Sequence, residues 1–365
     1  MRAPALLAAL ALPLLLGSCI TVNPHYDARK PHHRPEGFQN NHVTFEPRGL
    51  ADLLRWRWQA WQDDLPRRPQ SATPVVQPDL GFIHRNARAG AAMEPALTWI
   101  GHATMLVQMG GRTLLTDPVF SERASPVGFA GPQRAQPPGL ALRELPRVDV
   151  VLVSHDHYDH LDETSVAALQ AQPGGPPQFV APLGVGRLLR DMGATRVTEL
   201  DWWDKTQVDG LEIVLTPAQH WSGRGLYDRM STLWGGFAVF HETFHFFYSG
   251  DTGYSADFAE IARRFAPRQR GLGFDLALLP VGAYEPRWFM REQHVNPAEA
   301  VQIHREMGLQ RSVGVHWGTF ELTDEPLDEP PRALAEARRA AGLPDEAFTV
   351  MAVGETRRLP RRKAP

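Results

Sequence analysis

A run of six residues, His155-Asp156-His157-Tyr158-Asp159-His160, brings three imidazoles and two carboxylates together directly after an apolar segment. Alternate residues of an extended segment share a face, so His155 and His157 can bind one ion together. The turn that follows can direct Asp159 and His160 to a neighbouring position, giving two ions close together. Imidazole nitrogen and carboxylate oxygen suit zinc, and iron and manganese accept similar ligand sets. The motif therefore predicts a metal centre, because burying such groups without an ion is costly.

Two metals need more ligands than this run provides, and three candidates follow other apolar segments. They are His220, Asp251 and His316. A single histidine near a strand end is more often a structural residue. Taken together, in the order motif, histidine, aspartate, histidine, the candidates complete a ligand set for two ions.

The elements that must position these residues are short apolar runs punctuated by glycine and proline. The segment 148–154 is almost continuously apolar, which is typical of a strand buried on both faces. A main domain is expected from Leu97 onward, with these strands: Leu97–Gly101, Thr104–Met109, Arg112–Asp117, Val148–Ser154, Gln178–Ala181, Arg196–Leu200, Leu211–Thr216, Leu233–Phe240, Phe244–Ser249, Asp275–Pro280 and Arg311–His316. Helices are expected at Thr164–Gln170, Ser255–Phe265, Pro297–Met307 and Pro331–Ala340. Many strands and a few helices predict an α/β fold with two sheets covered outside by helices.

Composition narrows the class of protein. The chain has 365 residues, 43% hydrophobic and 22% charged, so it can bury a large core. A net charge of -3 provides no overall electrostatic surface for nucleic acid, and no nucleic-acid partner is expected. The single cysteine excludes an internal disulfide and any multi-cysteine zinc or iron-sulfur site.

The position of that cysteine indicates export. Residues 1–18 read as a signal peptide, with Arg2 before an apolar run too short to span a bilayer. Leu16-Gly17-Ser18-Cys19 resembles the bacterial lipobox, which predicts a lipoprotein held on a membrane surface through lipidated Cys19. Ile20 after the cysteine fits a periplasm-facing protein anchored in the outer membrane. An ordinary signal peptide is the alternative.

Three further regions flank the main domain, which is expected to span 97–356. Residues 19–48 are rich in proline and histidine without an apolar period, and we expect a solvated tether, with metal collection by the histidines as the alternative. Residues 49–96 form an N-terminal extension with an apolar helical stripe that either packs on the domain or touches lipid. Residues 357–365 form a basic tail, expected to be solvated, with contact to anionic lipid as the alternative.

Beyond the metal motif, blocks from Thr98 to about Gly342 resemble the N-acyl-phosphatidylethanolamine-hydrolysing phospholipase D family of the metallo-β-lactamase superfamily. The blocks are 98–104 (TWIGHAT), 116–121 (TDPVFS), 123–126 (RASP), 131–134 (GPQR), 157–162 (HYDHLD), 200–203 (LDWW), 250–254 (GDTGY), 282–290 (GAYEPRWFM), 293–295 (QHV) and 316–320 (HWGTF). The blocks 282–290 and 202–203 are far more specific than the metal motif, which many hydrolases share. The resemblance implies a four-layer αββα metallo-β-lactamase-like sandwich.

The same resemblance assigns roles to individual residues. It implies that His155, His157 and His220 bind one metal, that Asp159, His160 and His316 bind a second, and that Asp251 bridges them; two Zn²⁺ ions are expected, with iron or manganese as alternatives. Asp117 is expected to hydrogen-bond a ligand histidine and fix its tautomer. His294 is expected near the substrate, where it binds phosphate or protonates the leaving alkoxide. Asp159 is expected also to orient the attacking hydroxide.

The activity implied is hydrolysis of a phospholipid phosphodiester. Water held between two such ions has a pKa of about 7. As a metal-bridging hydroxide it would attack phosphorus and release an N-acylethanolamine and phosphatidic acid from an N-acyl-phosphatidylethanolamine-like substrate. Tryptophans near the motifs, at 202, 203, 221, 288 and 317, suit either an acyl-chain groove or the core.

Other hydrolases of the superfamily are weighed on the same residues. A β-lactamase with a metal-binding cysteine is excluded because Cys19 lies in the leader, and Asp251 argues against the all-histidine class. Net charge and export oppose an RNA-processing nuclease. A lactonase or other small-ester hydrolase remains as an alternative, as does a non-catalytic metal-bearing envelope lipoprotein. The sequence does not indicate the oligomeric state.

Overall fold

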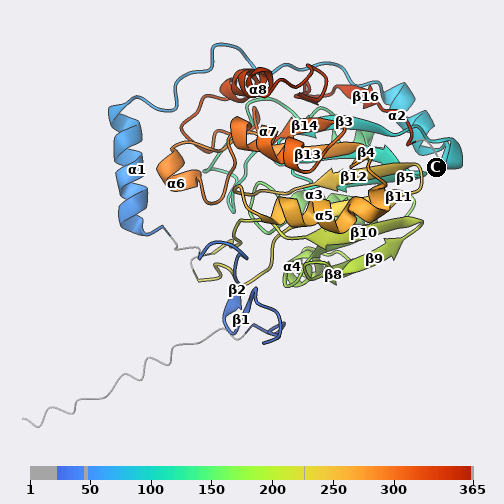
Figure 1. The fold of residues 1–365 in the computed structure, drawn as a ribbon, viewed down its shortest axis with the longest axis horizontal. Helices are drawn as coiled ribbons and strands as arrows, with labels where there is room; N and C mark the ends of the chain where they lie inside the picture. Colours follow the sequence, from blue (N-terminus) through green and yellow to red (C-terminus); the bar gives the residue numbers. More distant parts are fainter. Residues whose placement is uncertain (1–22, 45–47, 226, 363–365) are drawn as a thin grey trace, which may run out of the picture.

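The computed structural model describes residues 23–44, 48–225 and 227–362. The expected signal peptide and Cys19 lie outside these ranges. Two seven-stranded mixed sheets stack face to face, and helices cover their outer faces (Figure 1). The predicted α/β four-layer αββα sandwich is thereby confirmed.

The first sheet contains the order β16-β3-β4-β5-β6-β7-β8. Its strands β5, β6, β7 and β8 run parallel, while β16, β3 and β4 pair antiparallel with their neighbours. The bounds are β3 Ala96–Gly101, β4 Thr104–Met109, β5 Arg112–Thr116, β6 Val150–Leu152, β7 Gln178–Pro182, β8 Val197–Leu200 and β16 Thr356–Arg358.

The second sheet has the order β15-β14-β13-β12-β11-β10-β9. Strands β12 to β15 run parallel, and β9, β10 and β11 form an antiparallel meander that leads into β12. The bounds are β9 Lys205–Val208, β10 Leu211–Thr216, β11 Gly236–His241, β12 Phe244–Tyr248, β13 Leu276–Pro280, β14 Ser312–Val315 and β15 Phe348–Thr349.

The strands are apolar on both faces because each sheet is covered on both sides. In β4, Met105 and Val107 point to the layer between the sheets, while Leu106 points to the outer layer. The outer layer of the first sheet is filled from α2 Leu80–Ala87, α3 Glu163–Gln170 and α4 Val185–Asp191. The second sheet is covered by α5 Asp257–Gln269, α7 Pro297–Glu306 and α8 Glu329–Ala340.

Two helices lie at one side of the sandwich. They are α1 Leu50–Gln62, which stands apart from the sheets, and the short α6 Arg287–Met290 beside it (Figure 1). Single turns of 3-10 helix occur at Gly90–Ala92 and Leu142–Glu144. Among the residues that the structure describes, no helix combines the length and apolar character needed to cross a bilayer.

The segment expected as a solvated tether is folded where the structure describes it. Strands β1 His33–Arg34 and β2 Gly37–Phe38 form a small hairpin. Buried His32 and His33 place their Nε2 atoms 2.7 and 2.9 Å from the two oxygens of Asp201, and Lys30 pairs with the same carboxylate. His33 Nδ1 accepts the Asp27 N–H, so its Nε2 carries the proton and donates to Asp201. This arrangement attaches the segment to the sandwich, and the side chains of His32, His33 and Asp201 form a group that could also hold a metal ion.

The described part of the basic tail, residues 357–362, also differs from the solvated end that its charge suggests. Arg357 and Arg358 belong to β16, which pairs with β3. Arg362 donates to Asp275 through Nε at 2.9 Å and to the carbonyl oxygen of Gln269 at 3.2 Å. Backbone pairing and carbonyl acceptors hold these arginines against the sandwich.

Candidate metal centre

The candidate ligands converge because the strands that precede them end at one edge of the two sheets. His155 follows β6, and Asp117 follows the neighbouring parallel strand β5. On the second sheet Asp251 follows β12 and His316 follows β14, while β10, which leads to His220, runs in the same direction as β12. Carboxyl ends of strands in open α/β sheets form the usual site of ligand binding.

Three imidazoles form the first group. His155 Nε2 lies 2.8 Å from His157 Nδ1, and His220 Nε2 lies 3.4 Å from the same atom. Atoms bound to one zinc at 2.0–2.2 Å stand about 3.4 Å apart in a tetrahedron. The three nitrogens therefore form one group that could hold a metal ion.

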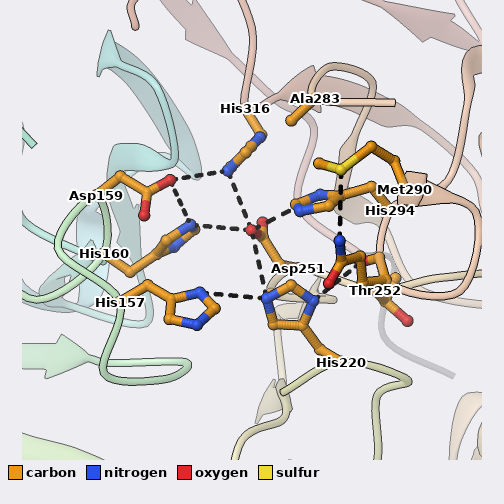
Figure 2. A network of polar contacts seen from close by, with 12 residues as sticks. His157, Asp159, His160, His220, Asp251, Thr252, Ala283, Met290, His294 and His316 are labelled. Atoms are coloured by element: carbon orange, nitrogen blue, oxygen red, sulfur yellow. Dashed lines mark hydrogen bonds and ion pairs between the residues drawn. The ribbon is translucent and has the colours of Figure 1, made fainter. Parts of the chain in front are cut away.

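The second group joins a carboxylate to two imidazoles. Asp159 Oδ2 lies 3.4 Å from His160 Nε2 and 3.2 Å from His316 Nε2 (Figure 2). His160 and His316 come from different sheets, and their rings stack with centroids 5.1 Å apart. The loop after β6 thus contributes to both groups.

Asp251 stands between the two groups. Its Oδ2 lies 3.1 Å from His160 Nε2, 3.0 Å from His316 Nε2 and 3.9 Å from His220 Nε2 (Figure 2). One carboxylate oxygen is therefore shared between ligands of both groups. A carboxylate in this position could bridge two ions.

The charges of the cluster fit bound cations. Burial raises the pKa of Asp159 and Asp251, but His160, His316 and their neighbours together outweigh burial and hold both pKa values well below their usual range. Burial lowers the pKa of His155 and His157 well below the usual value, so these rings are neutral. Buried His160 Nε2 faces both carboxylates, 3.1 Å from Asp251 Oδ2 and 3.4 Å from Asp159 Oδ2. Burial lowers the pKa of His160 and His316, but Asp251 and Asp159 together outweigh burial and raise both pKa values. These two rings would release a proton when a cation binds, whereas His155, His157 and the two carboxylates already have the protonation states of metal ligands.

Asp117 fixes the orientation of two rings from outside the ligand set. Its Oδ2 accepts a hydrogen bond from His160 Nδ1 at 2.6 Å and another from the Tyr248 hydroxyl. Ser154 Oγ donates to the same oxygen at 2.5 Å, which leaves Ser154 Oγ able to accept from His155 Nδ1 at 2.9 Å. Protons on both Nδ1 atoms leave the Nε2 lone pairs of His155 and His160 directed into the cluster.

His220 is held at both its ring and its backbone. His220 Nδ1 donates to the carbonyl oxygen of Gln293 at 2.9 Å, so Nε2 faces the other ligands. Buried Asn40 accepts the His220 N–H at 3.0 Å and donates to the His220 carbonyl oxygen at 2.9 Å. The amino-terminal segment is therefore part of the support of this ligand.

His102 is a member of the cluster that the sequence did not single out as a site residue. Its Nε2 lies 3.0 Å from Asp159 Oδ2, and its ring centroid is 4.0 Å from that of His316. His102 and His316 both adopt left-handed backbone conformations, with φ of 53° and 63°. Such strain in non-glycine residues concentrates at functional sites. His102 is not spaced from other histidines as in a metal motif. The sequence could have indicated it only through its position inside the block 98–104.

His294 lies beside the cluster without joining either group of three. Its Nδ1 is 3.9 Å from Asp251 Oδ2, and the ring packs against His220 and His316 (Figure 2). Nδ1 is buried and has no hydrogen-bond partner within the described ranges. Burial lowers the pKa of this imidazole well below its usual value. His294 thus presents a neutral ring nitrogen next to the candidate bridging carboxylate.

The block 282–290 braces this region. Arg287 donates to the carbonyl oxygen of His294 at 2.8 Å and to Glu299 at 2.8 Å. The Tyr284 hydroxyl donates to Glu329 at 2.7 Å. Neither side chain joins the ligand groups, and Arg287 acts on the site through the backbone of His294.

The tryptophans near the motifs have separate environments. Trp202 and Trp317 are buried in the largest of the hydrophobic clusters. Trp221 packs edge to face on His157, with ring centroids 4.2 Å apart. Of these three, only Trp221 borders the cluster.

Comparison with known proteins agrees with this fold and site. The Beta-lactamase superfamily domain matches residues 112–317. An uncharacterized protein of Mycobacterium tuberculosis is 40% identical over 319 residues, which cover 85% of this chain and 80% of that protein. The N-acyl-phosphatidylethanolamine-hydrolyzing phospholipase D 1 of Caenorhabditis elegans is 42% identical over 270 residues, 71% of this chain and 74% of that enzyme.

The fold is also similar to a solved structure, isothiocyanate hydrolase from Delia radicum gut bacteria. The two share 22% identity with a TM-score of 0.56, covering 73% of this chain and 99% of that one. This likeness supports the sandwich architecture alone. Homology to metal-dependent hydrolases and the His/Asp clusters show a metal-binding hydrolase. The chain belongs to the N-acyl-phosphatidylethanolamine-hydrolysing phospholipase D family of the metallo-β-lactamase superfamily.

Proposed function

We propose that this protein hydrolyses the phosphodiester of N-acyl-phosphatidylethanolamine-like phospholipids to an N-acylethanolamine and phosphatidic acid. The observation that carries the proposal is the convergence of six candidate ligands in two groups with Asp251 between them, in a chain 42% identical to a worm enzyme named for this activity. A phosphodiester suits such a site because its oxygens carry the charge that two cations stabilise.

Two divalent ions are proposed, with zinc as the first choice and iron or manganese as alternatives. His155, His157 and His220 would hold one ion, and Asp159, His160 and His316 the other, with Asp251 shared. When bound, such ions lower the pKa of water to about 7 and polarise phosphoryl oxygens.

The protein's own residues supply orientation and protons. Asp117 and Ser154 keep the Nδ1 protons of His160 and His155, so the opposite nitrogens stay available as ligands. Asp159, which His102 also contacts, is placed to orient a water by accepting its hydrogen bond. His294 would hydrogen-bond a phosphoryl oxygen through its buried Nδ1. The alternative, donation of a proton to the leaving alkoxide, requires the ring first to take up a proton from solvent, which its burial opposes.

The cellular setting is a proposal that rests on the sequence. Lipidation of Cys19 would hold the enzyme on a membrane facing the periplasm, where phospholipid substrate is concentrated. Globomycin treatment tests this directly: accumulation of the unprocessed precursor supports a lipoprotein, and unchanged processing contradicts it.

The activity is tested with purified metal-loaded protein, with and without chelator. The substrates are N-acyl-phosphatidylethanolamine, phosphatidylcholine, an acyl homoserine lactone and a β-lactam, and products are identified by mass. Chelator-sensitive release of an N-acylethanolamine is the expected result. Hydrolysis of the lactone alone would replace the proposal with a lactonase, and absence of turnover with bound metal would indicate a non-catalytic protein.

A further inference from the structure

Exposed apolar side chains concentrate on one face of α1. Five of its large apolar residues are exposed by 43% to 72%, namely Leu50, Leu53, Leu54, Trp58 and Trp61. Their spacing of three, four, eight and eleven residues from Leu50 places them along a single stripe of the helix. A contiguous exposed apolar stripe on a folded protein marks an interaction surface.

The helix is attached to the body through a different side, so this stripe stays available. Trp56 is buried, packs against Phe289 with ring centroids 4.8 Å apart, and donates from Nε1 to Asp324 at 2.8 Å. Arg55 lies over the Trp288 ring at 4.6 Å. These contacts fix α1 beside α6, the helix whose Arg287 bonds to the backbone of His294 (Figure 1).

Charge identifies the kind of partner. The segment 48–68 contains five arginines and three aspartates, a local net charge of +2 in a chain whose net charge is -3. Arg57 falls within the apolar stripe itself and is exposed. At a lipid surface an arginine in such a position can bury its stem and still reach phosphate groups. In an interface between two copies, the same charge would be buried against another apolar stripe.

The aromatic pair supports the same partner. Trp58 and Trp61 lie side by side, with ring centroids 5.1 Å apart. Tryptophan is enriched where membrane meets water, because its ring is apolar and its N–H is polar. We propose that the exposed stripe of α1 binds the surface of an anionic phospholipid bilayer and thereby holds the metal centre next to the membrane. The membrane-binding proposal rests on the proposed function only to explain why the protein would meet a membrane. Vesicle binding itself is measured without turnover.

The first test measures whether single positions on the protein surface enter an apolar environment when vesicles are added. Cys19 is the only cysteine, so a full chain carrying Cys19→Ser has no thiol. In that background, Leu54→Cys and Leu272→Cys each receive an environment-sensitive fluorophore. Leu272 is 47% exposed and lies in the turn between α5 and β13, outside α1. Its neighbour Gly273 accepts a hydrogen bond from Arg362.

Vesicles of phosphatidylethanolamine and phosphatidylglycerol are then added to the two labelled proteins. A blue shift at position 54 with no shift at 272 supports the proposal. Equal shifts at both positions, or none at 54, overturn it. A shift at 54 that appears without vesicles and grows with protein concentration also overturns it, since a second copy then covers the stripe.

The second test separates lipid binding from chemistry. The paired change Leu54→Ser with Trp61→Ser should lower turnover of vesicle-embedded substrate by about tenfold. Hydrolysis of a water-soluble phosphodiester should be unchanged, and Leu272→Ser should affect neither rate. Loss of both rates in equal measure would contradict a surface role. Absence of any phosphodiester hydrolysis in the unmodified chain would instead refute the proposed function and leave the fluorescence result standing.

Discussion

The side chain of Asn40 pairs with the backbone of His220 through two hydrogen bonds, accepting at 3.0 Å and donating at 2.9 Å. The two residues are 180 positions apart in the chain. A segment that composition alone describes as a linker therefore fixes the backbone of a candidate metal ligand.

Replacing this contact should weaken one metal position. With Asn40→Ala, the backbone of His220 loses both partners, and we expect metal affinity to fall by about tenfold, as for other groups that support ligands. Competition with a fluorescent chelator measures it. Asn41→Ala is the matched control, because Asn41 bonds to Asp257 and not to His220. Equal affinity in the two variants would show that Asn40 does not position the ligand.

The shared carboxylate is tested by Asp251→Asn. The amide keeps the shape but removes the charge that lies between His160 and His316. We expect loss of at least one metal per chain and nearly all activity, measured by elemental analysis and turnover. Asp191→Asn, on an exposed side chain of α4, serves as control. Two metals and full turnover in the Asp251 variant would remove the bridging assignment.

The tautomer argument is tested at Asp117. Asp117→Asn can present an N–H to His160 Nδ1, which favours the tautomer whose Nε2 is protonated. Metal affinity or activity should fall by about 10- to 100-fold. Thermal unfolding is recorded in parallel, together with Asp149→Asn, whose carboxylate accepts the Thr113 N–H away from the cluster. A change in stability with unaltered metal affinity would assign Asp117 a purely structural role.

A substitution at His294 tests whether turnover can be lost while metal binding is kept. Because it stands outside both groups of three, His294→Gln should retain two metals while kcat falls by about 100-fold or more, the usual range for a proton donor or acceptor. His241→Gln, at the end of β11, is the control. Loss of metal in the His294 variant would make this residue a ligand.

Buried His304, which is not among the candidate metal ligands, predicts how the stability of the fold changes as pH falls. Burial lowers the pKa of His304 from 6.5 to about 4. The unfolded chain therefore binds more protons between these values, so His304 contributes stability above pH 6.5 that is lost as pH falls towards 4. Between pH 7 and 4.5, the Tm of the His304→Gln variant should fall less than the Tm of the natural chain. Parallel Tm curves for the two proteins would contradict this.

The sequence predicted the elements that carry the ligands because their strands are long apolar runs that end in polar residues. β9 was missed, since Lys205–Val208 is a polar edge strand whose alternate side chains are exposed. The folding of the amino-terminal segment was missed for a related reason. It attaches through His32 and His33 to Asp201, and polar attachment leaves no apolar period to detect. The placement of His102 in the cluster depends on the backbone turn at Gly101, and residue spacing does not reveal such a turn.

The pairing of β16 with β3 makes residues 356–358 important for the stability of the first sheet. β3 is buried at every position and depends on Thr356–Arg358 to cover one row of its backbone N–H and C=O groups. A stop codon a dozen positions early would leave the candidate metal ligands intact yet open an apolar strand to pairing with other molecules. Such truncation would be lost to aggregation before any defect in chemistry could be seen.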